Sequence, residues 1–202
     1  MKSIAENEPK FTAILLAAGQ SKRFGGIKQL ADINGVSLIN HSLAKLLPLG
    51  FEILVVLGAN DELIQPRLVK NSKIRVIINT DWQQGIGSSL SFAVNEVADG
   101  ASHLLLALAD QIAMTTVDFQ HFISSAKENT DNIICAEYEH TLGVPAIFPK
   151  VFFKDLRQLT GDYGAKKVLQ NHSDQLIKLP FQRAAIDIDT QQDLLDWINK
   201  TS

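Results

Sequence analysis

The sequence has little of several features that restrict where and how a protein works. Its 202 residues include a single cysteine, Cys135, so the chain cannot form an internal disulfide bond. That cysteine lies in an apolar run, and we expect it to be buried and structural. No apolar run approaches the roughly 18 residues that span a membrane. Residues 1–10 are polar and lack the apolar stretch of a signal peptide. We therefore expect a cytoplasmic protein that does not associate with a membrane.

An excess of charge of one sign is also missing. The net charge is −3, which argues against a surface that binds nucleic acid. Hydrophobic residues make up 46% of the chain and charged residues 20%, which is typical of one folded domain with a sizeable core. Three cations, Lys22, Arg23 and Lys28, lie close together, and such a local group can hold a triphosphate.

Apolar runs alternate with helical patterns along most of the chain, which predicts an α/β fold with a mainly parallel sheet. After about residue 130 the alternation is less regular, so this part is able to form a second lobe. We expect strands over 13–17, 52–57, 74–78, 103–108, 133–138, 146–148, 176–179 and 185–188. We expect helices over 37–47, a short stretch after 60, 88–97, 115–128, 151–159, 165–171 and 190–200.

A stretch of glycine, serine and basic residues follows the first apolar run. It reads LAAGQSKRFG over residues 16–25, and Lys28 follows. Glycine lets the backbone approach an anion closely, and successive loop N–H groups form a concave anion site. Arg23 and Lys28 supply positive charge for phosphates. The stretch fits neither the GxxxxGK[ST] nor the GxGxxG template, and the alternative is an ordinary polar turn.

Acidic side chains end two of the predicted strands. Asp110 ends one apolar run, and Asp187 and Asp189 end a later one. A carboxylate at the carboxyl end of a central parallel strand lies where α/β sheets bind ligands, and strand residues two apart share a face. Mg²⁺ takes one or two carboxylates together with substrate phosphates. Asp110 with Asp187 or Asp189 is thus a candidate Mg²⁺ site. The alternative is that these residues belong to turns or helix caps, and Thr190 has the position of a cap.

Three further segments contain glycine. Residues 85–89, GIGSS, precede a predicted helix, where backbone N–H groups are free to meet a ligand. Residues 143–145 and 161–166 also contain glycine, and taken alone each of these segments is equally consistent with a plain turn. The five histidines have no metal-ligand spacing, and no serine lies in a nucleophile elbow, so a hydrolase triad is not indicated.

Taken in order, five segments resemble the MobA-like NTP transferases, and among these the molybdenum cofactor cytidylyltransferases. The segments are LAAGQSKRFG with Lys28, GIGSSL at 85–90, LADQ at 108–111, GDYGAK at 161–166 and DIDT at 187–190. The resemblance covers nearly the whole chain. It implies a Rossmann-like three-layer sandwich of the nucleotidyltransferase type. It also implies a single domain, 11–202, after a polar extension, 1–10, with a nucleotide-binding part, 11–130, and an acceptor-binding part, 131–202.

The resemblance also implies roles for single residues. The catalytic group would be Arg23, Lys28 and Asp110, with the two cations balancing charge on leaving pyrophosphate. Mg²⁺ would be bound by Asp110 together with Asp189 or Asp187. The nucleotide would be bound by Leu16, Ala17, Ala18, Gly19, Ser21, Arg23, Lys28, Gly85, Ser88 and Ser89. The acceptor would be bound by Gly143, Pro145, Asp162 and Lys166. Two prolines usual in the family are replaced by Ile27 and Ile112.

The implied reaction joins an NTP to a phosphate-bearing acceptor and releases pyrophosphate. CTP is favoured because the motif reads Ala17-Ala18, where guanylyl-transferring relatives have a glycine. The implied acceptor is molybdopterin, and the candidate recipient of the product is a molybdenum hydroxylase apo-enzyme. Three alternatives remain: another phosphorylated acceptor such as a sugar or polyol phosphate, a nicotinamide-dependent oxidoreductase as in a few relatives, and a non-enzymatic carrier that delivers cofactor to a molybdoenzyme.

Overall fold

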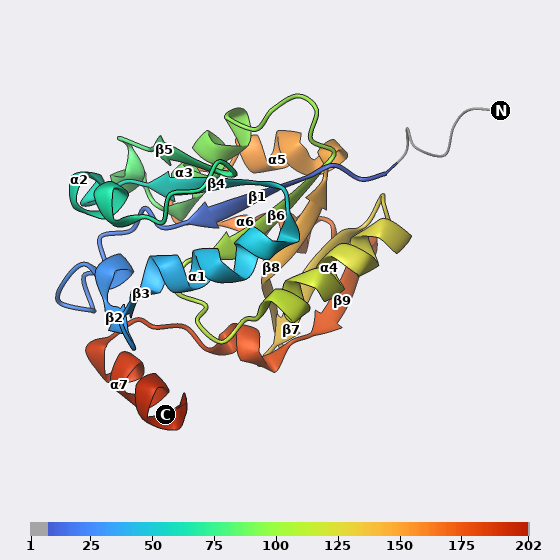
Figure 1. Cartoon of the computed structure of the whole chain (residues 1–202). Helices are drawn as coiled ribbons and strands as arrows, with labels where there is room; N and C mark the ends of the chain where they lie inside the picture. The colour runs from blue at the N-terminus through green and yellow to red at the C-terminus, as the bar shows by residue number, and fades with distance from the viewer. Residues whose placement is uncertain (1–7, 202) are drawn as a thin grey trace.

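A seven-stranded sheet forms the centre of the protein (Figure 1). The computed structural model describes residues 8–201, so residues 1–7 of the predicted polar extension lie outside it. The strand order is β5-β4-β1-β6-β8-β7-β9, and neighbours are parallel except that β8 is antiparallel to β6 and β7. The strands are β1 (Phe11–Leu16), β4 (Glu52–Leu57), β5 (Ile74–Ile78), β6 (His103–Leu108), β7 (Ile133–Tyr138), β8 (Thr141–Pro149) and β9 (Leu176–Pro180). The predicted α/β class and mainly parallel sheet are confirmed.

Helices cover both faces of the sheet and complete three layers (Figure 1). Helices α1 and α4 pack on one face, and α3, α5 and α6 pack on the other. The helices are α1 (Leu38–Leu46), α2 (Asp61–Ile64), α3 (Ile86–Asn95), α4 (Thr116–Glu128), α5 (Phe153–Arg157), α6 (Ala165–Asn171) and α7 (Gln191–Thr201). Short 3-10 helices are η2 (Lys28–Leu30), η3 (Leu47–Leu49), η4 (Gln65–Arg67), η5 (Trp82–Gln84), η6 (Lys150–Phe152), η7 (Ser173–Gln175) and η8 (Gln182–Ala185). A two-stranded pair, β2 (Asp32–Ile33) and β3 (Val36–Ser37), stands apart from the main sheet.

The central strands are buried on both faces, which is why they read as unbroken apolar runs. Successive residues of β1 enter different cores: Ile14 joins the cluster that contains Leu90 of α3, and Leu15 joins the cluster that contains Leu43 of α1. Such runs locate strands well. Predicted strands over 52–57, 74–78, 103–108 and 133–138 and the predicted helix over 165–171 agree with the structure residue for residue.

The predicted strand over 185–188 is wrong. The chain forms the 3-10 helix η8 and then an irregular segment, so Asp187 and Asp189 do not end a strand. The parallel edge next to β7 is already occupied by β9, and the segment is tied instead to the Asp110 turn, where the Ile188 N–H donates to the Asp110 carbonyl at 3.1 Å. The argument that the two carboxylates share one strand face therefore fails.

Other boundaries also shift. The helix predicted over 88–97 begins two residues earlier, after Gly85, whose φ is +101°. The helix predicted over 151–159 divides into η6 and α5. The short strand predicted over 146–148 is the end of β8, which forms a hairpin with β7. The two residues of the hairpin turn, Glu139 and His140, both have positive φ, and neither is the Gly or Asn that usually marks such a turn.

Reciprocal capping fixes the starts of the two longest helices. Thr115 and Asp118 form a capping box at the start of α4. At α7 the Thr190 N–H donates to Asp193 Oδ2 at 2.7 Å, and the Asp193 N–H donates to Thr190 Oγ1 at 3.2 Å. Each bond satisfies a donor that the first helical turn leaves free. Helix α7 lies beside the β2–β3 pair at one end of the molecule (Figure 1).

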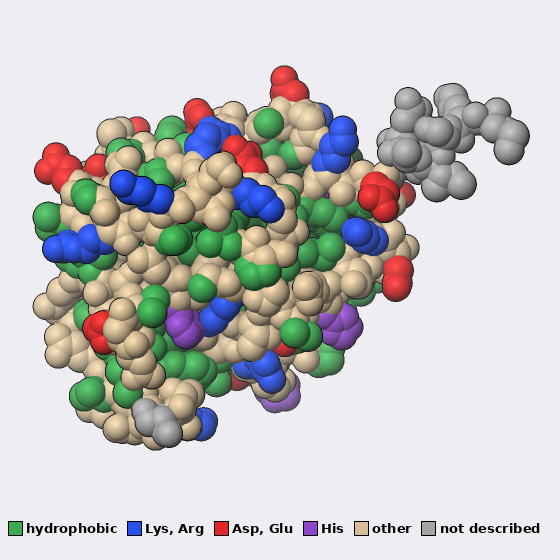
Figure 2. All heavy atoms as spheres, in the orientation of Figure 1, with side chains coloured by type: hydrophobic (Ala, Val, Ile, Leu, Met, Phe, Trp, Pro, Cys, Tyr) green, Lys and Arg blue, Asp and Glu red, His purple; other side chains and the backbone are tan. Residues whose placement is uncertain are grey.

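The surface carries mixed charge. On the face shown in Figure 2, Lys and Arg side chains are scattered among Asp and Glu. Within residues 8–201, no helix combines the length and the apolar character that crossing a membrane requires.

Candidate active site

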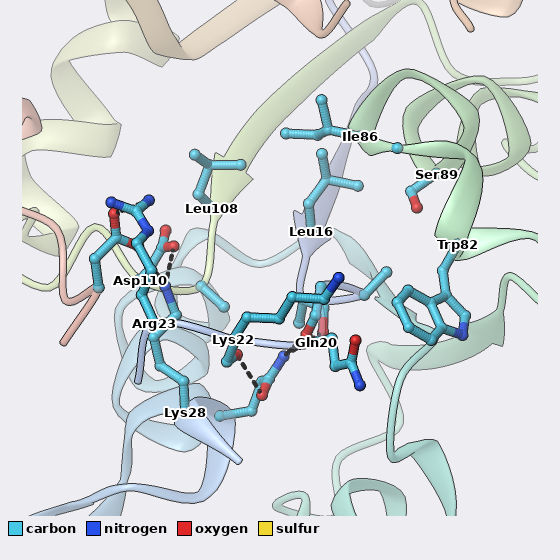
Figure 3. A pocket seen from close by; sticks show the side chains of 18 of the residues that line it. Leu16, Gln20, Lys22, Arg23, Lys28, Trp82, Ile86, Ser89, Leu108 and Asp110 are labelled. Carbon is cyan, nitrogen blue, oxygen red and sulfur yellow. Dashed lines mark hydrogen bonds and ion pairs between the residues drawn. The ribbon is translucent and has the colours of Figure 1, made fainter. Parts of the chain in front are cut away.

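A cavity of about 420 Å³ opens at the carboxyl ends of β1 and β6 (Figure 3). Strand β1 has β4 on one side and β6 on the other. The connections that follow β1 and precede β6 therefore run to opposite sides of the sheet, and the cavity lies at this topological switch point. Sequence-predicted site residues that line it are Leu16, Ala17, Ala18, Gly19, Ser21, Arg23, Lys28, Gly85, Ser89, Asp110 and Asp189. Of the residues predicted to bind the nucleotide or the metal, Ser88 and Asp187 do not line it.

The loop after β1 is folded around a buried glutamine. Gln29 Nε2 donates to the carbonyls of Ala17 at 2.8 Å and Gly19 at 2.9 Å. In the part of the chain that the structure describes, the backbone N–H groups of Gly19, Gln20 and Lys22 donate to no protein acceptor. Loop carbonyls are thus engaged while loop N–H donors stay free, which is the requirement for an anion cradle.

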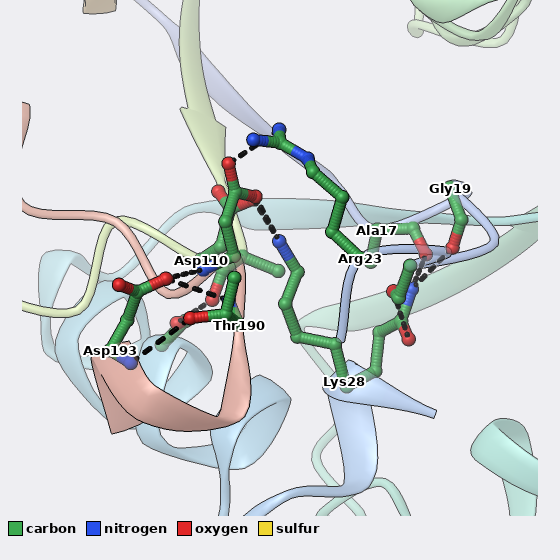
Figure 4. A network of polar contacts seen from close by, with 12 residues as sticks. Ala17, Gly19, Arg23, Lys28, Asp110, Thr190 and Asp193 are labelled. Carbon is green, nitrogen blue, oxygen red and sulfur yellow. Dashed lines mark hydrogen bonds and ion pairs between the residues drawn. The ribbon is translucent and has the colours of Figure 1, made fainter. Parts of the chain in front are cut away.

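Two cations and two carboxylates meet at one edge of the cavity (Figure 4). Lys28 Nζ lies 2.7 Å from Asp110 Oδ2 and 3.0 Å from Asp189 Oδ1, and Arg23 lies 2.6 Å from Asp189 Oδ2. Burial by itself lowers the pKa of Lys28, but the charges and hydrogen bonds of Asp110 and Asp189 outweigh it, and the pKa is raised. Lys28 is therefore charged, while the Arg23 side chain, 75% exposed, is free to turn toward a ligand.

The carboxylates fit a divalent cation of the Mg²⁺ type. Asp110 Oδ1 is buried and accepts no hydrogen bond. A buried charged oxygen without a partner is costly and needs a cation. No group of three or more His, Cys, Asp or Glu side chains able to hold a metal occurs within residues 8–201, so the protein offers one or two carboxylates. That is the number Mg²⁺ takes when substrate phosphates supply the remaining ligands.

Of the two candidates for the second carboxylate, Asp189 contacts the cluster through Lys28 and Arg23. Asp187 is exposed and makes no ion pair among the described residues. Desolvation by neighbouring atoms, together with the like charges of Asp110 and Asp189, raises the pKa of Asp187. This geometry favours Asp189 over Asp187 as the second carboxylate of the candidate metal site.

The glycines of the GIGSS segment are required by close packing. A side chain on Gly87 would place its Cβ 2.6 Å from the Tyr163 carbonyl oxygen, and the Gly87 N–H donates to the Gly161 carbonyl at 2.8 Å. The start of α3 and the 161–164 loop therefore touch backbone to backbone. Ser89 lines the cavity and accepts from Asn79 Nδ2 at 3.0 Å. Ser88 instead donates to the Asp81 carbonyl at 3.3 Å.

A second pocket of about 260 Å³ adjoins the first. Leu16, Ile86 and Leu108 line both, so the two share a wall. Of the predicted acceptor residues, Gly143 and Lys166 line this pocket, whereas Pro145 and Asp162 do not. Lys166 Nζ donates to Thr141 Oγ1 at 2.7 Å at the edge of an otherwise largely apolar lining.

Several residues of the main cavity were not predicted from the sequence: Gln20, Gln29, Leu38, Trp82, Gln83, Ile86, Leu108 and Ala109. The Trp82 ring lies at the cavity wall (Figure 3). The Trp82 side chain packs closely against Gly58, because a Cβ added at Gly58 would lie 2.6 Å from Trp82 Cβ. An aromatic residue shortly before the GIGSS segment was the available signal for Trp82. Gln29, next to Lys28, carried no signal of its own.

A mainly parallel α/β sandwich with a cation-bearing loop and carboxylates at one sheet edge is the architecture of a nucleotidyltransferase. The chain belongs to the MobA-like NTP transferase family: the model of the MobA-like NTP transferase domain matches residues 13–176. The predicted family is thereby confirmed.

Two individual proteins are similar to the chain in sequence. The chain is 38% identical over 113 residues to nicotine blue oxidoreductase of Paenarthrobacter nicotinovorans, a match that spans only 54% of each protein. It is 24% identical over 182 residues to molybdenum cofactor cytidylyltransferase of Escherichia coli strain K12, covering 90% of this chain and 92% of that protein.

Solved structures share the fold. A homologue of Mycobacterium tuberculosis Rv0371c from Mycobacterium sp. strain JC1 has a TM-score of 0.80 and 25% identity, covering 94% of this chain and 96% of that one. Rv0371c of M. tuberculosis H37Rv in complex with manganese has a TM-score of 0.76 and 21% identity, covering 94% and 98%.

Proposed function

We propose that this protein is a Mg²⁺-dependent cytidylyltransferase that joins CTP to molybdopterin and releases pyrophosphate. The observation that carries the proposal is the edge of the main cavity, where free loop N–H groups, Lys28, Arg23 and the Asp110 carboxylate converge. A triphosphate and a divalent cation need this combination of donors and oxygens. Similarity to the E. coli molybdenum cofactor cytidylyltransferase over most of the chain supports the acceptor.

The residues of this chain would act by positioning and by neutralising charge. The 16–25 loop binds the triphosphate, and the adjoining pocket holds the acceptor so that its phosphate oxygen faces the α-phosphorus. A bond forms from that oxygen to the α-phosphorus, and the bond from the α-phosphorus to the bridging oxygen of the β-phosphate breaks. Arg23 and Lys28 neutralise the leaving pyrophosphate. Mg²⁺, held by Asp110 and Asp189 when bound, would supply further charge neutralisation on the phosphate oxygens.

For the acceptor, we propose the second pocket. It shares a wall with the nucleotide cavity, so the reactive ends of two ligands can meet there. Lys166 is the cation placed to pair with the acceptor phosphate once it releases Thr141. The product would then pass to a molybdenum hydroxylase apo-enzyme.

A second candidate is favoured by one observation, the 38% identity to nicotine blue oxidoreductase over 113 residues. In that case the same cavity would hold a nicotinamide dinucleotide, whose pyrophosphate also needs cations and free N–H groups. The carboxylate pair supports the transferase, because nucleotidyl transfer uses carboxylates to hold a divalent cation beside the phosphates, whereas hydride transfer does not require them.

The test is pyrophosphate release, measured with each of the four NTPs and Mg²⁺, with and without molybdopterin. The proposal expects release that requires both CTP and molybdopterin. Release with CTP and another phosphorylated acceptor only would keep the transferase and replace the acceptor. No release with any pair, together with hydride transfer from a reduced nicotinamide to an added organic electron acceptor, would favour the oxidoreductase. Tight binding of molybdopterin without turnover would favour a carrier.

A further inference from the structure

Gln111, the residue after Asp110, joins three segments that are far apart in the sequence. Its side chain is buried, with 6% exposed. Its Nε2 atom donates to the Val144 carbonyl at 2.7 Å and to the Ala184 carbonyl at 2.9 Å. Both amide hydrogens are thereby used, so the orientation of the side chain is fixed. These two hydrogen bonds connect the turn that carries Asp110 to β8 and to η8.

Each of these carbonyls belongs to a segment of the site. Val144 lines the second pocket. Ala184 lies in η8, directly before the segment that carries Asp189. That segment belongs to no strand. Besides Gln111, it is tied to the Asp110 turn by one backbone hydrogen bond from Ile188, by the ion pairs through Lys28, and by the packing of Ile188 and Ile112 in one apolar cluster. A segment outside the sheet depends on such individual bonds for its position.

We infer that Gln111 is a positioning residue for nucleotidyl transfer: it sets the distance between Asp110 and Asp189 and fixes the acceptor pocket relative to both. This inference rests on the proposed function, because it assigns the two carboxylates to one metal ion. Gln111 is not in the lining of the nucleotide cavity, so it acts through its neighbours. Its loss leaves the buried Ala184 carbonyl and the half-buried Val144 carbonyl without this donor, and it lets the η8 segment move away from Asp110.

The test uses the full chain and Mn²⁺ as the metal probe, with CTP present and binding followed by electron paramagnetic resonance. Gln111→Met, close in length and without polar atoms, should weaken Mn²⁺ binding about tenfold, a loss of about 1.4 kcal/mol. The affinity for CTP without metal should stay unchanged. Gln111→Asn can keep only one of the two hydrogen bonds. It should fold more readily than Gln111→Met and show a smaller loss of Mn²⁺ affinity.

A matched control lies at the start of β6, the strand that precedes the Asp110 turn. His103 is also buried, with 5% exposed, and its Nε2 is 3.1 Å from the Thr130 carbonyl. His103→Leu should lower the melting temperature without changing Mn²⁺ affinity. If Gln111→Met and Gln111→Asn lower only the melting temperature and leave Mn²⁺ affinity at the wild-type value, Gln111 is merely structural and the inference is overturned.

A double-mutant cycle tests the route through Asp189. In an Asp189→Asn background, Gln111→Met should cause little further loss of Mn²⁺ affinity, because the ligand it positions is gone. A full, additive tenfold loss would contradict this route. Wild-type Mn²⁺ affinity in Asp189→Asn would overturn the metal assignment, and the inference with it. Absence of turnover with molybdopterin would contradict the acceptor alone, since the Mn²⁺ measurements need no acceptor.

Discussion

The ammonium group of Lys28 lies 2.7 Å from Asp110 Oδ2 and is also bonded to Asp189, so one protein cation bridges the two carboxylates proposed to bind Mg²⁺. The same lysine is proposed to hold the triphosphate. Both roles require that Lys28 leaves the carboxylates when nucleotide and metal bind together. Nucleotide and metal should therefore assist each other's binding.

Lys28→Met should separate these two effects. Removal of the bridging cation should strengthen Mn²⁺ binding without nucleotide by about threefold to tenfold, because the carboxylates lose a competing positive charge. The same change should lower kcat, with a loss of roughly 2–4 kcal/mol in transition-state stabilisation. Titration with Mn²⁺ and steady-state kinetics measure the two effects.

Lys22→Met is the matched control for the Mn²⁺ titration. Lys22 lies on the same loop as Lys28 and forms no ion pair with Asp110 or Asp189 among the described residues. It should leave Mn²⁺ binding unchanged. If Lys28→Met raises only the KM for CTP and leaves kcat at the wild-type value, Lys28 binds substrate without assisting the reaction.

Asp110→Asn should preserve the fold and lower turnover by about 100-fold or more, because a neutral amide holds Mg²⁺ poorly and Lys28 loses its closest partner. Asp189→Asn should also be severe, and Asp187→Asn mild. Circular dichroism checks the fold, and initial rates at saturating Mg²⁺ rank the three variants by their loss of turnover. Small and equal losses at all three positions would place the metal elsewhere.

Gly87→Ala should disturb the contact between α3 and the 161–164 loop, since the added Cβ would lie 2.6 Å from the Tyr163 carbonyl oxygen. We expect a loss of about 1–3 kcal/mol in the free energy of unfolding and weaker CTP binding. Gly100→Ala is the control, because nothing lies within 4 Å of the added Cβ. Urea denaturation measures the free energy of unfolding of both variants, and titration with CTP measures binding. Equal stability of the two variants would refute this packing.

Lys45 gives a pH-dependent prediction. Burial lowers its pKa from 10.5 to about 8, against the opposing charge of Asp118, while its Nζ donates to the Ile112 carbonyl. Between pH 8 and 10.5 the unfolded chain thus binds more protons at this site than the folded one, so this group's contribution to stability rises with pH.

Relative to Lys45→Met, the wild type should therefore gain about 2 kcal/mol in the free energy of unfolding between pH 7 and pH 10. Denaturation at several pH values measures this difference. Lys127→Met, an exposed change in α4, should show no such trend. A constant difference between wild type and Lys45→Met would contradict the lowered pKa.

The sequence predicted most of the sheet because buried parallel strands are unbroken apolar runs, and it placed Asp110 correctly after β6. It misplaced Asp187 and Asp189, because an apolar run ending in alternating residues looks like a strand even where the position beside β7 is already occupied by β9. The roles of Gln29 and Gln111 were not predictable, since each depends on carbonyls that only the folded chain brings near.

The most direct test of the central claim follows the α-phosphorus of CTP. CTP labelled at that atom is incubated with the protein, Mg²⁺ and molybdopterin, and the products are separated. The account predicts that the label moves into a molybdopterin–cytidine adduct, with one pyrophosphate released for each label transferred, and that Asp110→Asn abolishes both. Label that stays in CTP with every phosphorylated acceptor offered, while reduced nicotinamide is consumed, would contradict it.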